Sequence, residues 1–189
     1  MAREQHFRKG LNKHRNPMDN LNKKNVRIPI HDERLQLSLR TANEVDLPNL
    51  RQWKNEQREF FFFKGEISPE QQRAWFRTYQ ERGDDYMFIV RVDETAIGCM
   101  GIRLLDDVWD VYNVIRGSAD HGGKGLMSRA FQTMLHFATS HCPNTIAVQV
   151  LKNNPAMGWY KKNGFVIMSE QPDHFCLSYQ PENITKETL

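Results

Sequence analysis

The sequence contains no long hydrophobic run and no apolar leader. None of its apolar stretches approaches the roughly 18 residues that a membrane-spanning helix needs. The N-terminus is basic and polar, and it lacks the apolar core of a secretory signal. These absences predict a cytoplasmic protein that does not enter a membrane.

Cysteine is scarce, and the cysteines that are present have no metal-binding spacing. The chain has three, Cys99, Cys142 and Cys176, and no C-x-x-C pair. An odd count without a signal peptide favours reduced thiols. The seven histidines are scattered, and His136 and His141 are not at the i, i+4 spacing of a metal-binding helix. We therefore expect neither a disulfide framework nor a metal site.

Charge is concentrated at the N-terminus. Residues 1–30 carry eight basic side chains against two acidic ones, a net charge of +6, whereas the whole chain carries +3. Phe7 is the only aromatic residue in this segment, and no recognition motif accompanies it, which argues against a nucleic-acid binder. We expect residues 1–34 to form a flexible basic extension, residues 35–181 one domain, and residues 182–189 a short polar tail.

A glycine-rich stretch, HGGKGLMSRAF at residues 121–131, runs directly into a helix-periodic apolar segment. The first N–H groups of a helix have no intrahelical partner and attract anions, and glycines let a ligand approach the backbone. The stretch therefore predicts a phosphate site, although a flexible loop before an ordinary helix stays open. The P-loop pattern fails because Gly123 separates Gly122 from Lys124, and the dinucleotide pattern fails at Ser128.

The next informative segment is LKNNPAMGWYKKNGF at residues 151–165. It contains the pattern N-x-x-A-x-x-x-Y-x-x-x-G-F, from Asn153 to Phe165. Together with G-K-G before a helix, this segment resembles the GNAT superfamily of acetyl-CoA-dependent N-acetyltransferases. The family loop R/Q-x-x-G-x-G/A is matched at Gly125, but Gly122 replaces the leading Arg or Gln and Met127 replaces the closing small residue.

The order of expected elements is that of an α/β protein and is also the GNAT order. Expected strands cover residues 35–41, 86–92, 96–105, 110–116, 145–151, 165–168 and 175–179, and expected helices cover 44–56, 69–82, 123–138 and 155–163. The resemblance implies a GNAT fold, with a mixed central sheet of about six or seven strands flanked by about four helices.

The resemblance also implies which residues bind acetyl-CoA. Backbone amides of the loop would hold the pyrophosphate, the end of the fourth family strand would hold the arm and polarise the thioester carbonyl, and one asparagine would hydrogen-bond the cofactor. These residues are Gly122, Gly123, Lys124, Gly125, Leu126 and Met127 in the loop, Ile115, Arg116 and Gly117 at the strand end, and Asn153. Tyr160 occupies the position of the acid that protonates the leaving thiolate, and packing beneath the sheet is its alternative role.

No single base stands out for the incoming amine. The candidates are a water chain and the carboxylates Asp106, Asp107, Asp110 and Glu66, of which the first two resemble turn residues. Cys99 as an acyl-carrying nucleophile would need a base that nothing in the sequence indicates, so a buried structural thiol is preferred.

The acceptor is expected to be a primary amine of a small molecule. W-x-N-x-x-R at Trp53 to Arg58, followed by I-S-x-E-x-x-x-x-W-F at Ile67 to Phe76, is similar to GNATs that acetylate nucleotide-linked amino sugars. The G-K-G-L-M stretch is similar to the branch that acetylates protein N-termini, so that acceptor and an antibiotic amine stay open. A non-catalytic acyl-CoA-binding module is the alternative outside enzymes, and the sequence leaves the oligomeric state undetermined.

Overall fold

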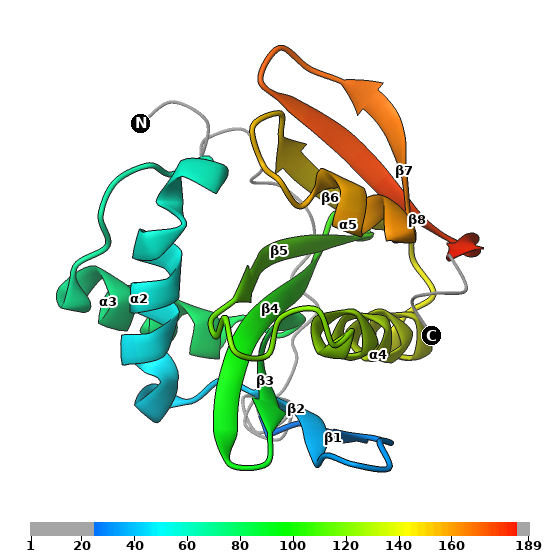
Figure 1. Ribbon diagram of the computed structural model, residues 1–189. Coiled ribbons are helices and arrows are strands. Elements are labelled where there is room, and N and C mark those ends of the chain that lie inside the picture. The colour runs from blue at the N-terminus through cyan, green and yellow to red at the C-terminus, as the bar shows by residue number, and fades with distance from the viewer. Residues whose placement is uncertain (1–24, 185–189) are drawn as a thin grey trace.

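Eight strands form one mixed sheet in the part of the chain that the computed structural model describes, residues 25–184 (Figure 1). Along the sheet their order is β1-β2-β3-β4-β5-β6-β8-β7, and every neighbouring pair is antiparallel except β5 and β6. The strands are β1 Arg27–Ile30, β2 Leu37–Thr41, β3 Asp85–Val92, β4 Thr95–Leu105, β5 Val108–Arg116, β6 Ile146–Leu151, β7 Asn163–Glu170 and β8 His174–Ile184. The mixed α/β class is confirmed, with slightly more strands than expected.

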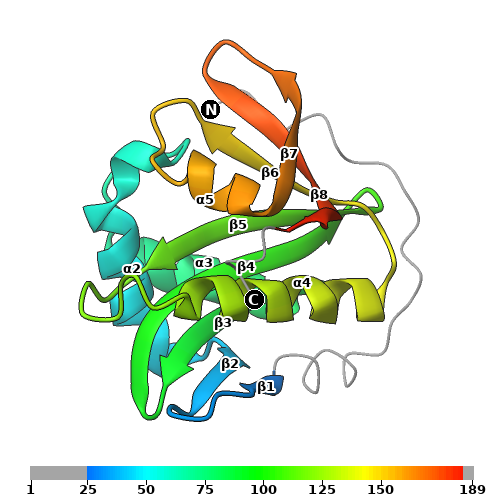
Figure 2. The ribbon, with the colours of Figure 1, turned by 45° about the vertical axis from the view of Figure 1, so that its right-hand side comes forward.

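Helices cover both faces of this sheet (Figure 2). Helices α2 and α3 pack one apolar cluster against β3, β4 and β5, and helices α4 and α5 pack a larger cluster on the opposite face. The helices are α2 Leu47–Glu56, α3 Pro69–Glu81, α4 Leu126–His141 and α5 Met157–Lys162, with short 3₁₀ turns at Glu44–Asp46 and Arg58–Phe60. Among the described residues, no helix has the length and apolarity needed to cross a bilayer.

The predicted start of α3 is confirmed in detail. The Ser68 hydroxyl accepts a hydrogen bond from the Gln71 amide, and the Gln71 side chain accepts one from the Ser68 amide, which makes a capping box with Pro69 at the first helical position. Helix α4, in contrast, begins at Leu126 rather than near Gly123, because Gly123 and Gly125 both adopt positive φ.

Strand β1 was not expected from the sequence. Its four residues RIPI pair with β2 at the edge of the sheet, within the segment assigned to the extension. Asp32 beyond it forms an ion pair with Arg129 of α4, which lowers the pKa of Asp32 to about 2. Folded structure therefore begins before residue 35, and β8 continues to Ile184, past the expected end at 181. Residues 1–24 and 185–189, most of the basic extension and of the tail, lie outside the described residues.

Two irregularities of β5 shape the centre of the sheet. Cys99 of β4 pairs with Ile115 and Gly101 pairs with Tyr112, so two residues of β5, Asn113 and Val114, face one residue of β4. This is a β-bulge, and Asn113 adopts a positive φ of 48° within it. On its other side β5 pairs with β6 over three residue pairs only, from Trp109–Ile146 to Val111–Val148. Beyond these pairs the two parallel strands part (Figure 2).

Candidate active site

A cleft lies where β5 and β6 part. It has a volume of about 220 Å³ and is lined by the bulged part of β5, by β6, by α5 and by the aromatic segment Phe60–Phe63 that follows α2. Strand edges face each other here without pairing, because the register between β5 and β6 ends at Val111 and Val148. Unpaired backbone groups at such an edge can accept an added extended chain.

Tyr160 of α5 lines this cleft. Its ring is 6% exposed and packs edge-on against Phe131 and Phe165, at centroid distances of 6.0 and 5.8 Å. Burial raises the pKa of its hydroxyl above the ordinary value of a tyrosine. The hydroxyl is therefore protonated at neutral pH, as a proton donor must be, and the ring also serves the packing role that was its alternative.

The glycine loop before α4 leaves its backbone bare. Gly123 and Gly125 have φ values of 73° and 70°, and a Cβ built at either would meet no atom within 4 Å. Gly125 caps α4, so the unpartnered N–H groups of the first turn follow it directly. The side chains of Leu126 and Met127 point inward, since Leu126 is 3% exposed in the core and Met127 packs on Gly98, while Lys124 is exposed. The loop therefore presents its backbone and the Lys124 side chain to a ligand.

The end of β5 joins this loop to α2. Gln57 donates from Nε2 to the Arg116 carbonyl at 3.0 Å, and a Cβ at Gly122 would lie 2.8 Å from the Arg116 guanidinium. Ile115 is buried and faces the α2 side of the sheet. Asn113 and Val114, rather than residues 115–117, therefore line the cleft.

Gly117 is required for packing. A Cβ there would lie 2.1 Å from the Trp53 indole, which is itself 6% exposed. We expect Gly117→Ala to lower the free energy of unfolding by about 1–3 kcal/mol in urea titrations, because it overpacks the joint between α2 and β5. The matched control is Gly158→Ala in α5, where a Cβ meets nothing and φ is not positive; it should leave stability unchanged or raise it by up to about 1 kcal/mol. If the two variants changed the free energy of unfolding equally, the Trp53 indole would be able to move aside without destabilising the protein.

Asn153 and its neighbour hold the aromatic segment. The Asn153 side chain donates to the Glu59 carbonyl at 3.1 Å, and the Asn154 side chain donates to the Phe60 carbonyl at 3.3 Å. Asn154 lines the cleft, whereas Asn153 is exposed. Phe62 also contacts the ring of His174 at the start of β8, with centroids 5.3 Å apart. The segment therefore bridges the helical side of the molecule and the β6–β8 side.

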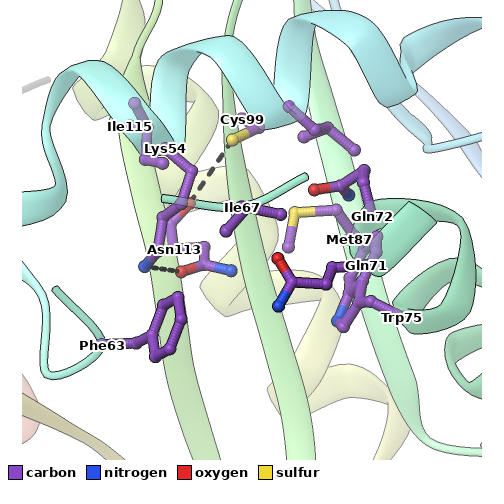
Figure 3. A pocket seen from close by; sticks show the side chains of 11 residues that line it. Lys54, Phe63, Ile67, Gln71, Gln72, Trp75, Met87, Cys99, Asn113 and Ile115 are labelled. Atoms are coloured by element: carbon purple, nitrogen blue, oxygen red, sulfur yellow. Dashed lines mark hydrogen bonds between the residues drawn. The ribbon is translucent and has the colours of Figure 1, made fainter. Parts of the chain in front are cut away.

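A second cavity of about 250 Å³ lies on the α2–α3 face of the sheet (Figure 3). Its wall is mainly apolar, with three side-chain amides and one amine. The lining residues are Leu50, Lys54, Phe63, Ile67, Gln71, Gln72, Trp75, Met87, Cys99, Asn113 and Ile115. Lys54, Phe63 and Asn113 also line the cleft between β5 and β6, so the two cavities meet at these residues.

Lys54 and Asn113 are functional candidates that sequence reasoning missed. Lys54 Nζ donates to Asn113 Oδ1 at 2.6 Å, as Figure 3 shows, and lies 3.1 Å from the centroid of the Phe61 ring. Burial lowers the pKa of Lys54 to about 7. No sequence signal marks either residue, because their proximity arises from the packing of α2 on the bulge of β5.

The other residues considered from the sequence differ in what they contact. Asn55 is occupied by the backbone of Ile67, which donates to it at 2.8 Å and accepts from it at 3.0 Å, so it ties down the loop before α3. Trp53 and Phe76 are core residues, whereas Trp75 and Phe63 line the second cavity. Burial raises the pKa of Cys99 to about 12, which keeps this buried thiol protonated.

None of the carboxylates considered as bases lines the second cavity. Asp110 pairs with Arg103 at 2.9 Å, and burial raises its pKa. Asp106 and Asp107 both have positive φ in the turn between β4 and β5, which confirms them as turn residues. Glu66 is exposed. Within residues 25–184, no three His, Cys, Asp or Glu side chains are grouped as a metal site would require.

Solved structures with this arrangement include several acetyltransferases. Spermidine N-acetyltransferase from Vibrio cholerae, in complex with CoA and spermine, has a TM-score of 0.67 at 17% identity, covering 78% of this chain and 96% of that one. FdhC, a nucleotide-linked sugar GNAT, has a TM-score of 0.66 at 18% identity, covering 78% and 88%. A domain from Methanocaldococcus jannaschii has a TM-score of 0.67 at 16% identity, covering 76% of this chain and 97% of that one. At these identities the likeness shows the fold alone.

Sequence comparison adds the family. A search among curated protein sequences gives no match. The model of the acetyltransferase (GNAT) domain, however, matches residues 36–166, which is most of the chain and spans β2 to the start of β7. The chain therefore belongs to the GNAT family of acetyltransferases, and it is an acyltransferase whose cosubstrate is acetyl-CoA.

Proposed function

We propose that this enzyme transfers the acetyl group to a primary amine of a small molecule, and that the acceptor is an amino sugar. The observation that carries the proposal is the junction of two cavities at Lys54, Phe63 and Asn113. One cavity suits the cosubstrate arm and the other suits the acceptor, so the thioester and the amine would meet at the bulge of β5.

The residues around the cleft fit acetyl-CoA. Gly123 and Gly125 are open, and the helix start behind them offers N–H groups to a pyrophosphate. The parted edges of β5 and β6 offer backbone partners to the peptide-like arm. When bound, acetyl-CoA supplies an activated acetyl group on a thiol leaving group. We assign the pyrophosphate to the loop Gly122–Met127, and the arm to the edge formed by Asn113 and Val114 and continuing to Arg116.

Tyr160 is the proposed proton donor. Tyr160 lines the cleft and its hydroxyl stays protonated, so this group would deliver a proton to the departing sulfur. Asn154, on the same wall, is a better-placed amide than Asn153 for a contact with the arm, but both now hold the aromatic segment. Either amide would have to exchange its Glu59 or Phe60 partner to contact the cosubstrate.

The acceptor cavity favours a neutral ring over a polycation. Trp75 and Phe63 supply aromatic rings, and Gln71 and Gln72 supply amide groups that suit hydroxyls. No carboxylate lines the cavity, so a second ammonium group would find no counter-ion there. The bridge from Asn153 and His174 to the aromatic segment also narrows the route that an extended peptide would take. These features argue against polyamines, aminoglycosides and protein N-termini.

An acceptor screen tests the proposal. Thiol release from acetyl-CoA would be followed with nucleotide-linked amino sugars, aminoglycosides, spermine and short peptides with free N-termini. We expect an amino sugar to give the highest kcat/KM, about tenfold or more above spermine, because one unpaired ammonium in an apolar cavity costs at least about 1.4 kcal/mol. Trp75→Leu should raise KM for the sugar and leave KM for acetyl-CoA unchanged.

Two results would overturn this assignment. If a peptide gave a higher kcat/KM than every sugar, the function would be protein acetylation. The aromatic segment would then have to move away from the cleft. Binding of acetyl-CoA without transfer to any acceptor in the panel would favour a non-catalytic acyl-CoA-binding module.

A further inference from the structure

The position of Lys54 gives it access to both reactants. Its side chain leaves the last turn of α2, lines the acceptor cavity and the cleft, and ends on the bulge of β5 at Asn113. We propose that Lys54 is the catalytic base, which takes a proton from the acceptor ammonium where the two cavities meet. The inference rests on the proposed function, since it assumes that the acceptor amine enters this cavity.

Burial favours the neutral form of Lys54, against the Phe61 ring, which lies 3.1 Å from Nζ and favours the ammonium form. Within the described residues it has no ion-pair partner, and its hydrogen bond goes to the uncharged amide of Asn113. From β4 it faces the protonated thiol of Cys99, and from α3 the uncharged Gln71, Gln72 and Trp75. Because burial without a counter-ion disfavours the ammonium form, the pKa of Lys54 falls to about 7.

The charged groups farther along the cleft are engaged elsewhere. Asp110 of β5 pairs with Arg103 of β4, and the Tyr112 hydroxyl donates to the Asp85 carboxylate. Tyr160 of α5 is protonated. None of these groups pairs with Lys54, so its pKa of about 7 lies near the pH at which a catalytic base works best.

Lys54, Tyr160 and solvent account for every proton in the reaction. Neutral Lys54 takes one proton from the acceptor ammonium, and the freed amine attacks the acetyl carbon. The N–C bond forms as the C–S bond breaks, and the proposed donor Tyr160 protonates the leaving sulfur. The nitrogen loses a second proton as the amide forms, and this proton restores the Tyr160 hydroxyl, while Lys54 releases its proton to solvent. One proton is released for each acetyl group transferred.

The ionisation of Lys54 can be measured without an acceptor. Competitive labelling with trace acetic anhydride, followed by mass spectrometry of the lysine peptides, reports the neutral fraction of each amine as pH rises. We expect half-maximal labelling of Lys54 near pH 7, well below the ordinary lysine value of about 10.4. A value near 10 for Lys54 would overturn the proposal.

Kinetics then tests its role with the fastest acceptor of the screen. Lys54→Met removes the amine, and Lys54→Arg keeps the positive charge but cannot lose its proton. At pH 7 both should lower kcat by about 100-fold with unchanged acetyl-CoA affinity, whereas the surface control Lys152→Met should not. The wild-type rate should fall as pH drops through about 7, because the base becomes protonated, and both variants should lose this inflection.

The outcomes separate the two proposals. If Lys54→Arg retained the rate, the group would serve as a positive charge and not as a base. If Lys54→Met kept the inflection near pH 7, another residue would be the base. Absence of transfer to every acceptor would instead refute the proposed function, while the labelling result would still report whether Lys54 can act as a base.

Discussion

Substitution of Gly125 by aspartate is expected to weaken CoA binding by about 100-fold. Gly125 caps α4 with a φ of 70°, and nothing lies within 4 Å of a Cβ built there. The new carboxylate would therefore point into open space, where we place the pyrophosphate. A like charge at about 4 Å costs about 1–4 kcal/mol between the dielectric limits of water and of a protein surface, which is about five- to 700-fold in affinity. Titration calorimetry with CoA measures it.

The matched control is Gly125→Asn. Asparagine has nearly the same shape as aspartate and tolerates the left-handed region, but it carries no charge. We expect it to weaken CoA binding less than tenfold, with equal thermal stability for the two variants. Dephospho-CoA, which keeps the pyrophosphate, should show the same contrast. If asparagine and aspartate weakened binding equally, the pyrophosphate would have to lie away from this loop.

Replacement of Tyr160 by phenylalanine is expected to lower kcat by about 100-fold. The substitution removes only the hydroxyl, and the ring contacts with Phe131 and Phe165 remain. Loss of a positioned acid typically costs about two to four orders of magnitude in rate. Because the hydroxyl would act on the departing sulfur, the dissociation constant of acetyl-CoA should change little, so kcat falls without a matching loss of binding.

The control for this variant is Tyr179→Phe. The Tyr179 hydroxyl donates to Gln132 at 3.0 Å, away from the lining of both cavities, so its loss should leave kcat unchanged. Unfolding curves should show both variants folded at the assay temperature. Unchanged turnover in Tyr160→Phe would mean that water or another group protonates the thiolate, and Tyr160 would then be a packing residue only.

The sequence predicted the elements whose patterns are strong. The expected strands from 35–41 to 145–151 correspond to β2 to β6, the expected helix at 69–82 corresponds to α3, and the helix-periodic apolar segment after the glycines corresponds to α4. Strand β1 was missed because four residues that include Pro29 make a weak strand signal, and only pairing with β2 orders them. The observed ends of α5 and β8 also differ from the expected ones. Strand β8 is longer than expected because it continues to pair with β7 beyond the apolar residues of β8.

The site was only partly predictable. The glycine loop and Tyr160 could be proposed because their spacing resembles a family pattern. Lys54 could not, because a lysine in a polar helical turn resembles any surface lysine until α2 packs on β5 and covers it. The positive φ at Asn113 carried no signal either, since asparagine is common in ordinary turns. Burial and strand irregularity are properties of the folded chain.

The acceptor cavity and the proposed pyrophosphate loop draw on different parts of the chain, with a consequence for how this enzyme can change. Every residue that lines the acceptor cavity lies between Leu50 and Ile115. The loop proposed for the pyrophosphate, together with α4 and the Tyr160 ring, follows later in the chain and packs on the opposite face of the sheet. Mutations that alter acceptor preference can therefore accumulate at residues that line only the acceptor cavity, while the loop, α4 and Tyr160 are inherited intact. Three residues line both cavities, so a mutation at any of them would affect the acceptor and the donor together: Lys54, Phe63 and Asn113.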